Sequence, residues 1–410
     1  MNRVPLATLS AEFNRLAWSN LAAQSAEQIN LAAVPIVAVL ALNAGAGQTG
    51  FLSAAQTLPF LLLSLPIGLL VDRVPRRLVM VIAEVLRTLA LGAFPILAAL
   101  GMLSVPLLAI LGFAGAAGTV AFSIAAPSLV QAIVGRDALA AANGRLELAR
   151  SAAFAAGPAL AGALVAWTGA SPAFLLAALL SGTAAILLAR IREPLRPRQP
   201  RRNAMHELRE GAGFAWGHPL LRPILLTAIV WNLSWFVLQA AYVPYAVHVL
   251  GLSARGVGAT LGAYGAGMVV GAMLAPRIAR RISFGLLIAL GPLASVVAGM
   301  IMIASLARPV SLLPAAAFFL FGAGPILWTI GQTTLRQAVT PAALLGRVSA
   351  LATMATTGAR PIGAAIGGFV GAEYGLTNCI LLSALGFLVQ ALVIMVSPVP
   401  RLEKVPHAVA

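Results

Sequence analysis

Long apolar runs alternate with short polar loops along this chain. An α-helix needs about 20 residues to cross the roughly 30 Å hydrocarbon layer of a bilayer, and it satisfies its own backbone polar groups. The pattern therefore predicts an all-α membrane protein with twelve transmembrane helices. The predicted spans cover residues 16–42, 48–71, 78–100, 105–134, 139–167, 172–191, 223–250, 256–278, 284–306, 310–339, 344–373 and 377–396.

Composition supports this interpretation. Of the 410 residues, 60% are hydrophobic and only 9% are charged, and the mean hydropathy is +0.96. Such a balance is typical of membrane proteins, because a water-soluble surface needs more charge. The first span is too long for a cleavable signal peptide, and polar residues interrupt its first half. We expect it to stay in the protein.

A basic segment divides the predicted spans into two groups of six. Residues 192–222 carry several prolines and arginines, followed by a short amphipathic stretch over residues 206–216. This composition predicts a cytoplasmic linker between an N-terminal six-helix bundle, residues 1–191, and a C-terminal bundle, residues 223–410.

The net charge of +16 is concentrated in loops on one side of the predicted membrane. The loops on the opposite side contain only two arginines, Arg255 and Arg308. By the positive-inside rule, both termini and the linker are predicted to be cytoplasmic, in the inner membrane of a cell. Nucleic-acid binding is disfavoured, because the charge does not form a basic face on a soluble domain.

The two halves resemble each other. Asp72-Arg73-Val74-Pro75-Arg76-Arg77 corresponds to the stretch from Pro276 to Arg281, and Arg73 and Arg277 are 204 residues apart. Gly144-Arg145 and Gly346-Arg347 are 202 residues apart. Pro158 and Pro361 are 203 residues apart. Offsets that agree to within two residues indicate duplication, and a repeat of six plus six helices suits a transporter with its site between the halves.

The loop after the second span resembles a motif of the major facilitator superfamily, and the resemblance covers essentially the whole chain. Its residues here are Gly68, Asp72, Arg73, Arg76 and Arg77. The resemblance implies that Asp72 binds neighbouring helix ends and stabilises the outward-facing state, while the arginines face anionic lipid and nearby carboxylates. Pro75 stands where the family more often has glycine.

The fifth span resembles the family's antiporters. Gly157, Pro158 and Gly162 are similar to the motif that antiporters carry, although Ala161 replaces one expected glycine. The stretch from Pro127 to Gly162 is similar to the branch of siderophore and macrolide exporters. The fourth span lacks the arginine that the drug-antiporter pattern uses for proton coupling, so a proton path there is not implied.

Glu27 is the first candidate for proton coupling or substrate binding. It lies about 16 Å along the first span, close to mid-membrane, on one helical face with Asn20 and Gln24. Burial disfavours the charged carboxylate, so this side chain could take up a proton. The alternative is a structural hydrogen bond.

Arg360 lies in the middle of the eleventh span, immediately before Pro361. A charge at this depth needs a partner. We considered a substrate carboxylate, Glu27 across the cavity, and backbone carbonyls freed by the proline.

Two acid–arginine pairs are spaced to bond within one helix. Glu84 and Arg87 on the third span predict a buried ion pair that holds neighbouring helices, with a functional role as the alternative. Glu147 and Arg150 on the fifth span are interpreted as gate or scaffold contacts.

Aromatic and amide side chains suggest a cavity wall. The seventh span carries Trp231, Trp235, Tyr242 and Tyr245 with Gln239, and the tenth carries Trp328 and Gln332. Ordinary packing, or an interfacial belt for the tyrosines, is the alternative to binding a planar or amphipathic substrate.

The sequence predicts no enzyme. It has no phosphate-binding Walker motif, no convergent nucleophile and base, and no histidine pair at metal spacing; one cysteine, Cys379, excludes an intrachain disulfide. We therefore expect a secondary transporter without a cofactor or metal, driven by a proton gradient, functional as a monomer, that exports a small amphipathic molecule of the drug or siderophore class by alternating access. The alternatives are a proton-coupled importer, a lipid or lysolipid flippase, and a non-transporting membrane sensor.

Overall fold

The computed structural model describes residues 10–71, 73–134, 138–194 and 204–406, so Asp72 and Arg136 lie outside the described residues. The helices before the linker are α1 (Ala11–Leu42), α2 (Ala46–Leu62), α3 (Ser64–Val71), α4 (Arg76–Ala99), α5 (Val105–Ile133), α6 (Leu139–Thr168) and α7 (Ala170–Ala189). Those that follow are α8 (Ala204–Gly217), α9 (Leu221–His248), α10 (Ala254–Ala279), α11 (Phe284–Ala307), α12 (Leu312–Val339), α13 (Ala342–Glu373), α14 (Leu376–Val396) and the 3-10 turn η2 (Val399–Arg401).

The observed helices confirm the predicted all-α membrane fold. Among the described residues, ten helices are long and apolar enough to cross a membrane. The second predicted span is divided, because α2 ends at Leu62 and α3 begins at Ser64. Pro66 has no N–H to donate to the carbonyl of Leu62, which accounts for the interruption. The eleventh span, α13, is 32 residues long, but Arg360, threonines and glycines lower its apolarity. With these two, the spans reach the predicted twelve.

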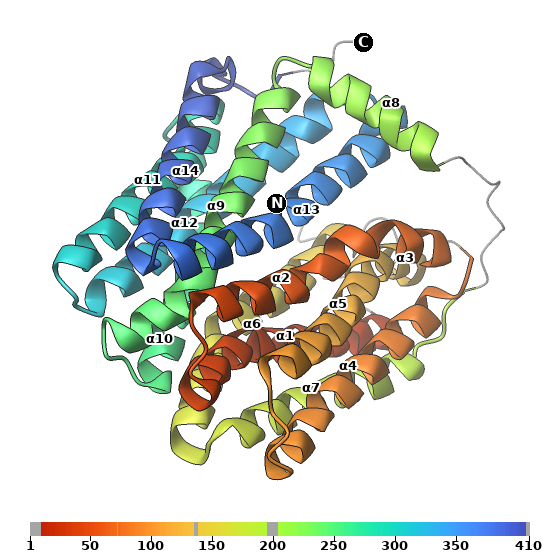
Figure 1. Ribbon diagram of the computed structural model, residues 1–410. Helices are drawn as coiled ribbons and strands as arrows, with labels where there is room; N and C mark the ends of the chain where they lie inside the picture. Colours follow the sequence, from red (N-terminus) through yellow and green to blue (C-terminus); the bar gives the residue numbers. More distant parts are fainter. Residues whose placement is uncertain (1–9, 72, 135–137, 195–203, 407–410) are drawn as a thin grey trace.

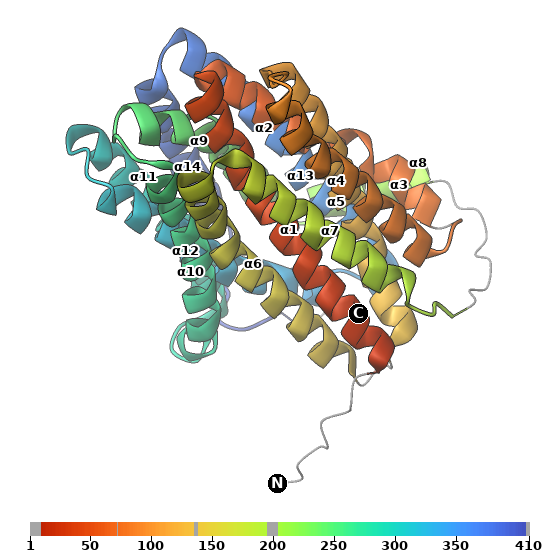
Figure 2. The same cartoon turned by 90° about the horizontal axis from the view of Figure 1, so that it is seen from below.

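Helices α1–α7 form one bundle and α9–α14 form a second, which we call the N-terminal and C-terminal bundles. Figure 1 shows them on opposite sides of the molecule, with α8 at one end of the C-terminal bundle, and Figure 2 shows α6 and α10 meeting from the two bundles. The main contacts between the bundles join α2 to α13 and α6 to α10.

Glycines allow both crossings to be tight. A Cβ atom on Gly50 would lie 2.2 Å from Cα of Gly368, and a Cβ on Gly258 would lie 2.8 Å from Cα of Gly162. All four glycines lie toward the helix ends whose loops carry few arginines, which we call the arginine-poor side. Here the backbones of the two bundles touch, so any opening on this side must first separate them.

Replacing Gly50 with leucine should therefore shift the protein toward a state open on the arginine-poor side. A side chain at this position has no space against Gly368, and overpacking typically costs about 1–3 kcal/mol. Distances between spin labels at Asn43 and Asn378, measured by pulsed electron resonance, should lengthen in the variant. Gly45→Leu is the matched control, because a Cβ there meets nothing within 4 Å.

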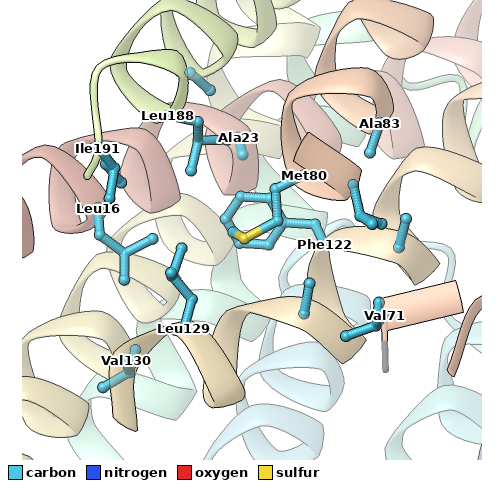
Figure 3. Close-up of a cluster of buried hydrophobic side chains, with 14 of the residues drawn as sticks. Leu16, Ala23, Val71, Met80, Ala83, Phe122, Leu129, Val130, Leu188 and Ile191 are labelled. Atoms are coloured by element: carbon cyan, nitrogen blue, oxygen red, sulfur yellow. The ribbon is translucent and has the colours of Figure 1, made fainter. Parts of the chain in front are cut away.

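The core of the N-terminal bundle lies between α1, α4, α5 and α7. Leu16, Met80, Phe122 and Leu188 are nearly or fully buried there. Figure 3 shows these side chains gathered between the four helices, with Met80 and Phe122 near the centre of the view. Apolar side chains of this size fix how the four helices pack.

The chain segment after the last helix of each bundle covers the start of that bundle's third span. In the N-terminal bundle, the carboxylate of Glu193 accepts hydrogen bonds from the backbone N–H groups of Arg76 and Arg77, at 3.2 and 2.9 Å. In the C-terminal bundle, the carbonyls of Glu403 and Leu402 accept from the N–H groups of Phe284 and Gly285. Each contact satisfies N–H groups that a helix start leaves without partners, which supports the internal repeat.

Candidate functional site

A central cavity of about 300 Å³ lies between the two bundles. Its wall comes from α1, α2, α4, α5 and α6 on one side and from α9, α10, α12 and α13 on the other. A cavity shared by two bundles changes shape when the bundles move relative to each other. This position makes it the candidate functional site.

Glu27 brings a carboxyl group to the cavity from α1. Its side chain is half-buried, and it lies near the hydroxyl of Thr119 on α5. The same hydroxyl oxygen accepts a hydrogen bond of 2.5 Å from Arg87. Thr119 thus lies beside both Glu27 and the buried arginine of α4.

The other two polar residues predicted on this face of α1 do not line the cavity. Asn20 is buried and donates a hydrogen bond of 3.2 Å to the carbonyl of Leu146 on α6. Gln24 is half-buried. The polar residues of α1 that do reach the cavity with Glu27 are Gln28 and Asn30, which the sequence interpretation missed.

Arg360 brings a guanidinium group to the same cavity from α13. Its Nε atom donates a hydrogen bond of 3.2 Å to Oδ1 of Asn232, and its charged group lies over the rings of Phe60 and Phe236, at 5.5 and 5.8 Å from their centroids. In the described part of the chain, no carboxylate lies within ion-pair distance of it. An amide oxygen and two aromatic rings thus contact Arg360 in place of the anion that we had considered. The positive charge of Arg360 is therefore available to a ligand.

Glu84 and Arg87 form the predicted buried pair, with 2.9 Å between Oε1 and Nη1 and side chains 0% and 3% exposed. Ser181 on α7 donates to Glu84 at 2.7 Å, while Arg87 also donates to the carbonyl of Ala23 on α1. The pair therefore joins α4 to α1, α5 and α7. Arg87 lies at the edge of the central cavity as well.

Glu147 and Arg150 form the second pair, with hydrogen bonds of 2.5 and 2.9 Å. Here both side chains are partly exposed, and the guanidinium lies 5.3 Å from the ring centroid of Phe154. Arg150 also lines the central cavity. The pair thus places a second arginine at the cavity, contributed by the N-terminal bundle.

Aromatic side chains of α9 form part of the wall. The rings of Trp231 and Trp235 are stacked, with centroids 5.4 Å apart, and both residues line the cavity together with Gln239. Tyr242 and Tyr245 are fully buried instead, and their hydroxyls bond to Thr260 and Ser305. The alternative interpretation, that these tyrosines form an interfacial belt, is therefore wrong, because packing inside the C-terminal bundle encloses both rings.

Trp328 and Gln332 line a second cavity of about 230 Å³, whose wall comes mostly from the C-terminal bundle. This cavity shares Arg150, Trp231 and Arg360 with the central one. Trp328 and Gln332 therefore do not line the central cavity, but they line a cavity that shares residues with it.

The antiporter-like motif on α6 is a packing surface. A Cβ on Gly157 would lie 2.4 Å from Cβ of Gln28 on α1, and Gly162 approaches Gly258 on α10. Pro158 lines the central cavity. The motif thus lets α6 contact the first helix of its own bundle and the opposite bundle at once.

The loop motif lies far from the cavity, at the helix ends whose loops carry most arginines. Gly68 is on α3, Arg73 is exposed in the following turn, and Arg76 and Arg77 begin α4. Arg77 donates to the carbonyl of Ile191 at 3.1 Å, and Arg76 lies 4.0 Å from the carboxylate of Glu193. This is a carboxylate contact of the kind that the family resemblance implies.

In the residues that the structure describes, no group of three or more histidine, cysteine, aspartate or glutamate side chains could hold a metal ion. The acid and amide groups of the cavity are spread over several helices.

Comparison with known proteins identifies the family. The profile of the Major Facilitator Superfamily matches residues 16–364. The chain is 30% identical over 285 residues to the enterobactin exporter EntS of Citrobacter koseri, covering 69% of this chain and 66% of the relative. It is 30% identical over 277 residues to the enterobactin exporter EntS of Escherichia coli O1:K1 / APEC, covering 67% of this chain and 64% of that relative. The matches span slightly less than two thirds of these relatives.

Solved structures show the same fold. A bacterial homologue of the iron transporter ferroportin in an inward-facing state has a TM-score of 0.74 and 20% identity, covering 94% of this chain and 98% of that one. The outward-facing state of a bacterial ferroportin homologue gives a TM-score of 0.64, with 18% identity and 94% and 99% coverage. An inward-facing bacterial homologue of the human lysosomal transporter Spinster gives 0.71, with 14% identity and 94% and 96% coverage. This multi-pass membrane protein therefore belongs to the major facilitator superfamily.

Proposed function

We propose that this protein is a proton-coupled exporter that moves a small amphipathic molecule across the inner membrane by alternating access. The observation that carries the proposal is that Glu27 of one bundle and Arg360 of the other line one cavity. A movement of the bundles changes the distance between these two charges. Ligand binding and proton binding at this cavity can therefore favour different states.

The state described here is the one that would accept a substrate from the cytoplasm. Its bundles touch on the arginine-poor side, through Gly50 with Gly368 and Gly162 with Gly258. By the positive-inside rule, that side faces away from the cytoplasm. The higher TM-score to an inward-facing ferroportin homologue than to an outward-facing one agrees with this interpretation.

The surroundings of Glu27 support proton coupling. When its carboxyl group is ionised, the negative charge attracts Arg360 across the cavity, and when it is protonated this attraction is lost. A substrate whose acceptor group binds Arg360 and whose donor group binds Glu27 needs the ionised carboxylate. Substrate and proton would then compete for Glu27 and favour different facing states, so that the two are exchanged across the membrane.

The cavity suggests a substrate with aromatic surface. Trp231, Trp235, Phe60 and Phe236 offer ring faces, while Asn30 and Gln56 offer amide groups. The curated relatives export enterobactin by their printed names. We therefore propose a siderophore or a drug-like molecule of similar chemistry as the substrate.

Replacing Glu27 with glutamine should abolish proton-coupled transport, because the amide cannot bind and release a proton. Inverted membrane vesicles would be acidified inside by ATP hydrolysis, and the release of protons on adding enterobactin or aromatic drugs would be followed with a fluorescent pH probe. We expect release with the wild type, and at least about a tenfold slower release with Glu27→Gln.

The matched control is Glu373→Gln, which removes an exposed carboxylate at the end of α13 and should release protons like the wild type. Unchanged release in Glu27→Gln would rule out this carboxyl group as the coupling site. Movement of the compound and the protons through the protein in the same direction would indicate a proton-coupled importer.

A further inference from the structure

A third cavity, of about 310 Å³, lies within the C-terminal bundle near the arginine-rich side. Its wall is formed by α9, α12 and α13, and Ala215 of α8 contributes at one end. The cavity is mainly lined by leucine, alanine and threonine side chains, and its one charged lining residue is Arg336.

Arg336 is a half-buried cation with no carboxylate partner among the described residues. Its Nε atom is inaccessible to solvent and has no hydrogen-bond partner. Across the residues with a described structure, no carboxylate lies within ion-pair distance of its guanidinium group. Other arginines at the helix ends of this side are satisfied differently: Arg347 pairs with Glu210, and Arg277 donates to the carbonyl of Met273. A buried N–H group that lacks a partner is costly unless a ligand supplies one.

Neighbouring side chains leave a second donor for an anion. The hydroxyl oxygen of Thr333 accepts a hydrogen bond of 3.0 Å from Nε2 of Gln332. Its own O–H is then free to donate, and Thr333 lies in the cavity wall with Arg336. A carboxylate or phosphate oxygen accepts strongly from a guanidinium and a hydroxyl together.

The third cavity continues toward the central site. Thr329, Gln332 and Thr356 line both the third and the second cavity. Arg150 and Arg360 line both the second and the central cavity. The three cavities therefore form a series in which arginines recur from the arginine-rich side to the middle of the molecule.

We propose that Arg336, with Thr333, forms an entrance site that binds the anionic group of an organic acid on its way from the cytoplasm to Arg360. The site takes carboxylate or phosphate chemistry. Such an anion could come from a cytoplasmic organic acid or from a phospholipid headgroup, and the shape of the series favours the organic acid because the cavities lead inward to the central site. The assignment of a transport path rests on the proposed function, whereas anion binding at Arg336 does not.

The experiment measures salicylate binding by titration calorimetry at equal pH on both sides, without any gradient. The full chain is placed in phosphatidylcholine nanodiscs and carries Arg360→Gln, so that the guanidinium of Arg360 cannot bind the probe. We expect this protein to bind salicylate, and added Arg336→Gln to weaken binding by at least about tenfold, because a charge-assisted hydrogen bond is lost. The control is added Arg401→Gln, which removes an exposed arginine of the same bundle and should change the affinity less than about twofold.

A second measurement uses the wild type, in case a variant does not fold. Photo-crosslinking with 4-azidosalicylate should label the peptides that contain Thr333 or Thr353. Three outcomes would each overturn the site. They are an equal salicylate affinity with and without Arg336→Gln, an equal loss of affinity on adding Arg401→Gln, and labelling confined to residues of the central cavity.

Nanodiscs that contain phosphatidylglycerol distinguish the two anion sources. Salicylate binding that is unchanged by this lipid supports the organic acid as the occupant. Loss of salicylate binding in its presence would assign the site to a lipid headgroup and would overturn the entrance role. Because no proton gradient is used, a failure of proton-coupled export would leave these results unaffected.

Discussion

Replacing Arg87 with methionine should lower the free energy of unfolding by about 3–5 kcal/mol, enough to prevent stable folding of many domains. The substitution keeps most of the side-chain volume but leaves the carboxylate of Glu84 buried, at 0% exposure, without its cation. It also removes the hydrogen bonds that join α4 to the carbonyl of Ala23 on α1 and to Thr119 on α5. Unfolding in mixed detergent micelles, titrated with a denaturing detergent and followed by circular dichroism, would measure the loss.

The matched control is Arg150→Met, which breaks a pair of the same spacing on another helix. Because the Glu147–Arg150 side chains are 51% and 33% exposed, water replaces the lost partner and the change should stay below about 1 kcal/mol. The double variant Arg87→Met with Glu84→Gln should recover part of the loss, since no buried charge remains. A loss in Arg87→Met no larger than that in Arg150→Met would contradict the structural role of the buried pair.

Replacing Arg360 with glutamine should reduce transport by about 10- to 150-fold, because a charged hydrogen-bond donor to an anion contributes about 1.5–3 kcal/mol. Its Nε atom already uses Asn232 as an acceptor, so the outer nitrogens remain for the ligand. Arg360→Lys keeps the charge but not the planar fork, and we expect it to retain only part of the activity. Substrate-dependent proton release in inverted vesicles gives the rate.

The control for this prediction is Arg255→Gln. Arg255 lies at the start of α10, on the arginine-poor side, with its guanidinium 5.5 Å from the ring centroid of Trp167, and its loss should leave the rate nearly unchanged. Full activity of Arg360→Gln, with correct insertion verified by membrane fractionation, would exclude the guanidinium from substrate binding.

Helical spans were predictable to within a few residues, because apolar length and flanking charge are local properties. The division of the second span at Leu63 was missed, although Pro66 carried the signal. The pair of Glu84 and Arg87 was predictable from its spacing within one helix, and the structure supports the structural interpretation. Glu193 was not predicted, since its contact with the start of α4 joins residues more than 100 positions apart.

The first helix shows why the composition of the site was only partly predictable. Asn20 and Glu27 share a helical face, but they are about 10 Å apart along the axis. Because packed helices cross at an angle, the helices that neighbour α1 change over this distance. Asn20 contacts the backbone of α6, and Glu27 lines the central cavity. Helical periodicity gives the face of a residue but not the neighbour at its depth.

The sequence by itself determined the membrane-spanning character, the number of spans, the two related groups of helices and the candidates Glu27 and Arg360. Each follows from local chemistry, because apolar length selects the bilayer and a charge within a span is rare. Only the tertiary structure decided that these two side chains face one cavity and that Asn232 and aromatic rings surround Arg360. It also decided that the Nε atom of Arg336 has no partner among the described residues. These facts depend on contacts between helices distant in sequence, and such contacts are fixed by the packing of the whole bundle.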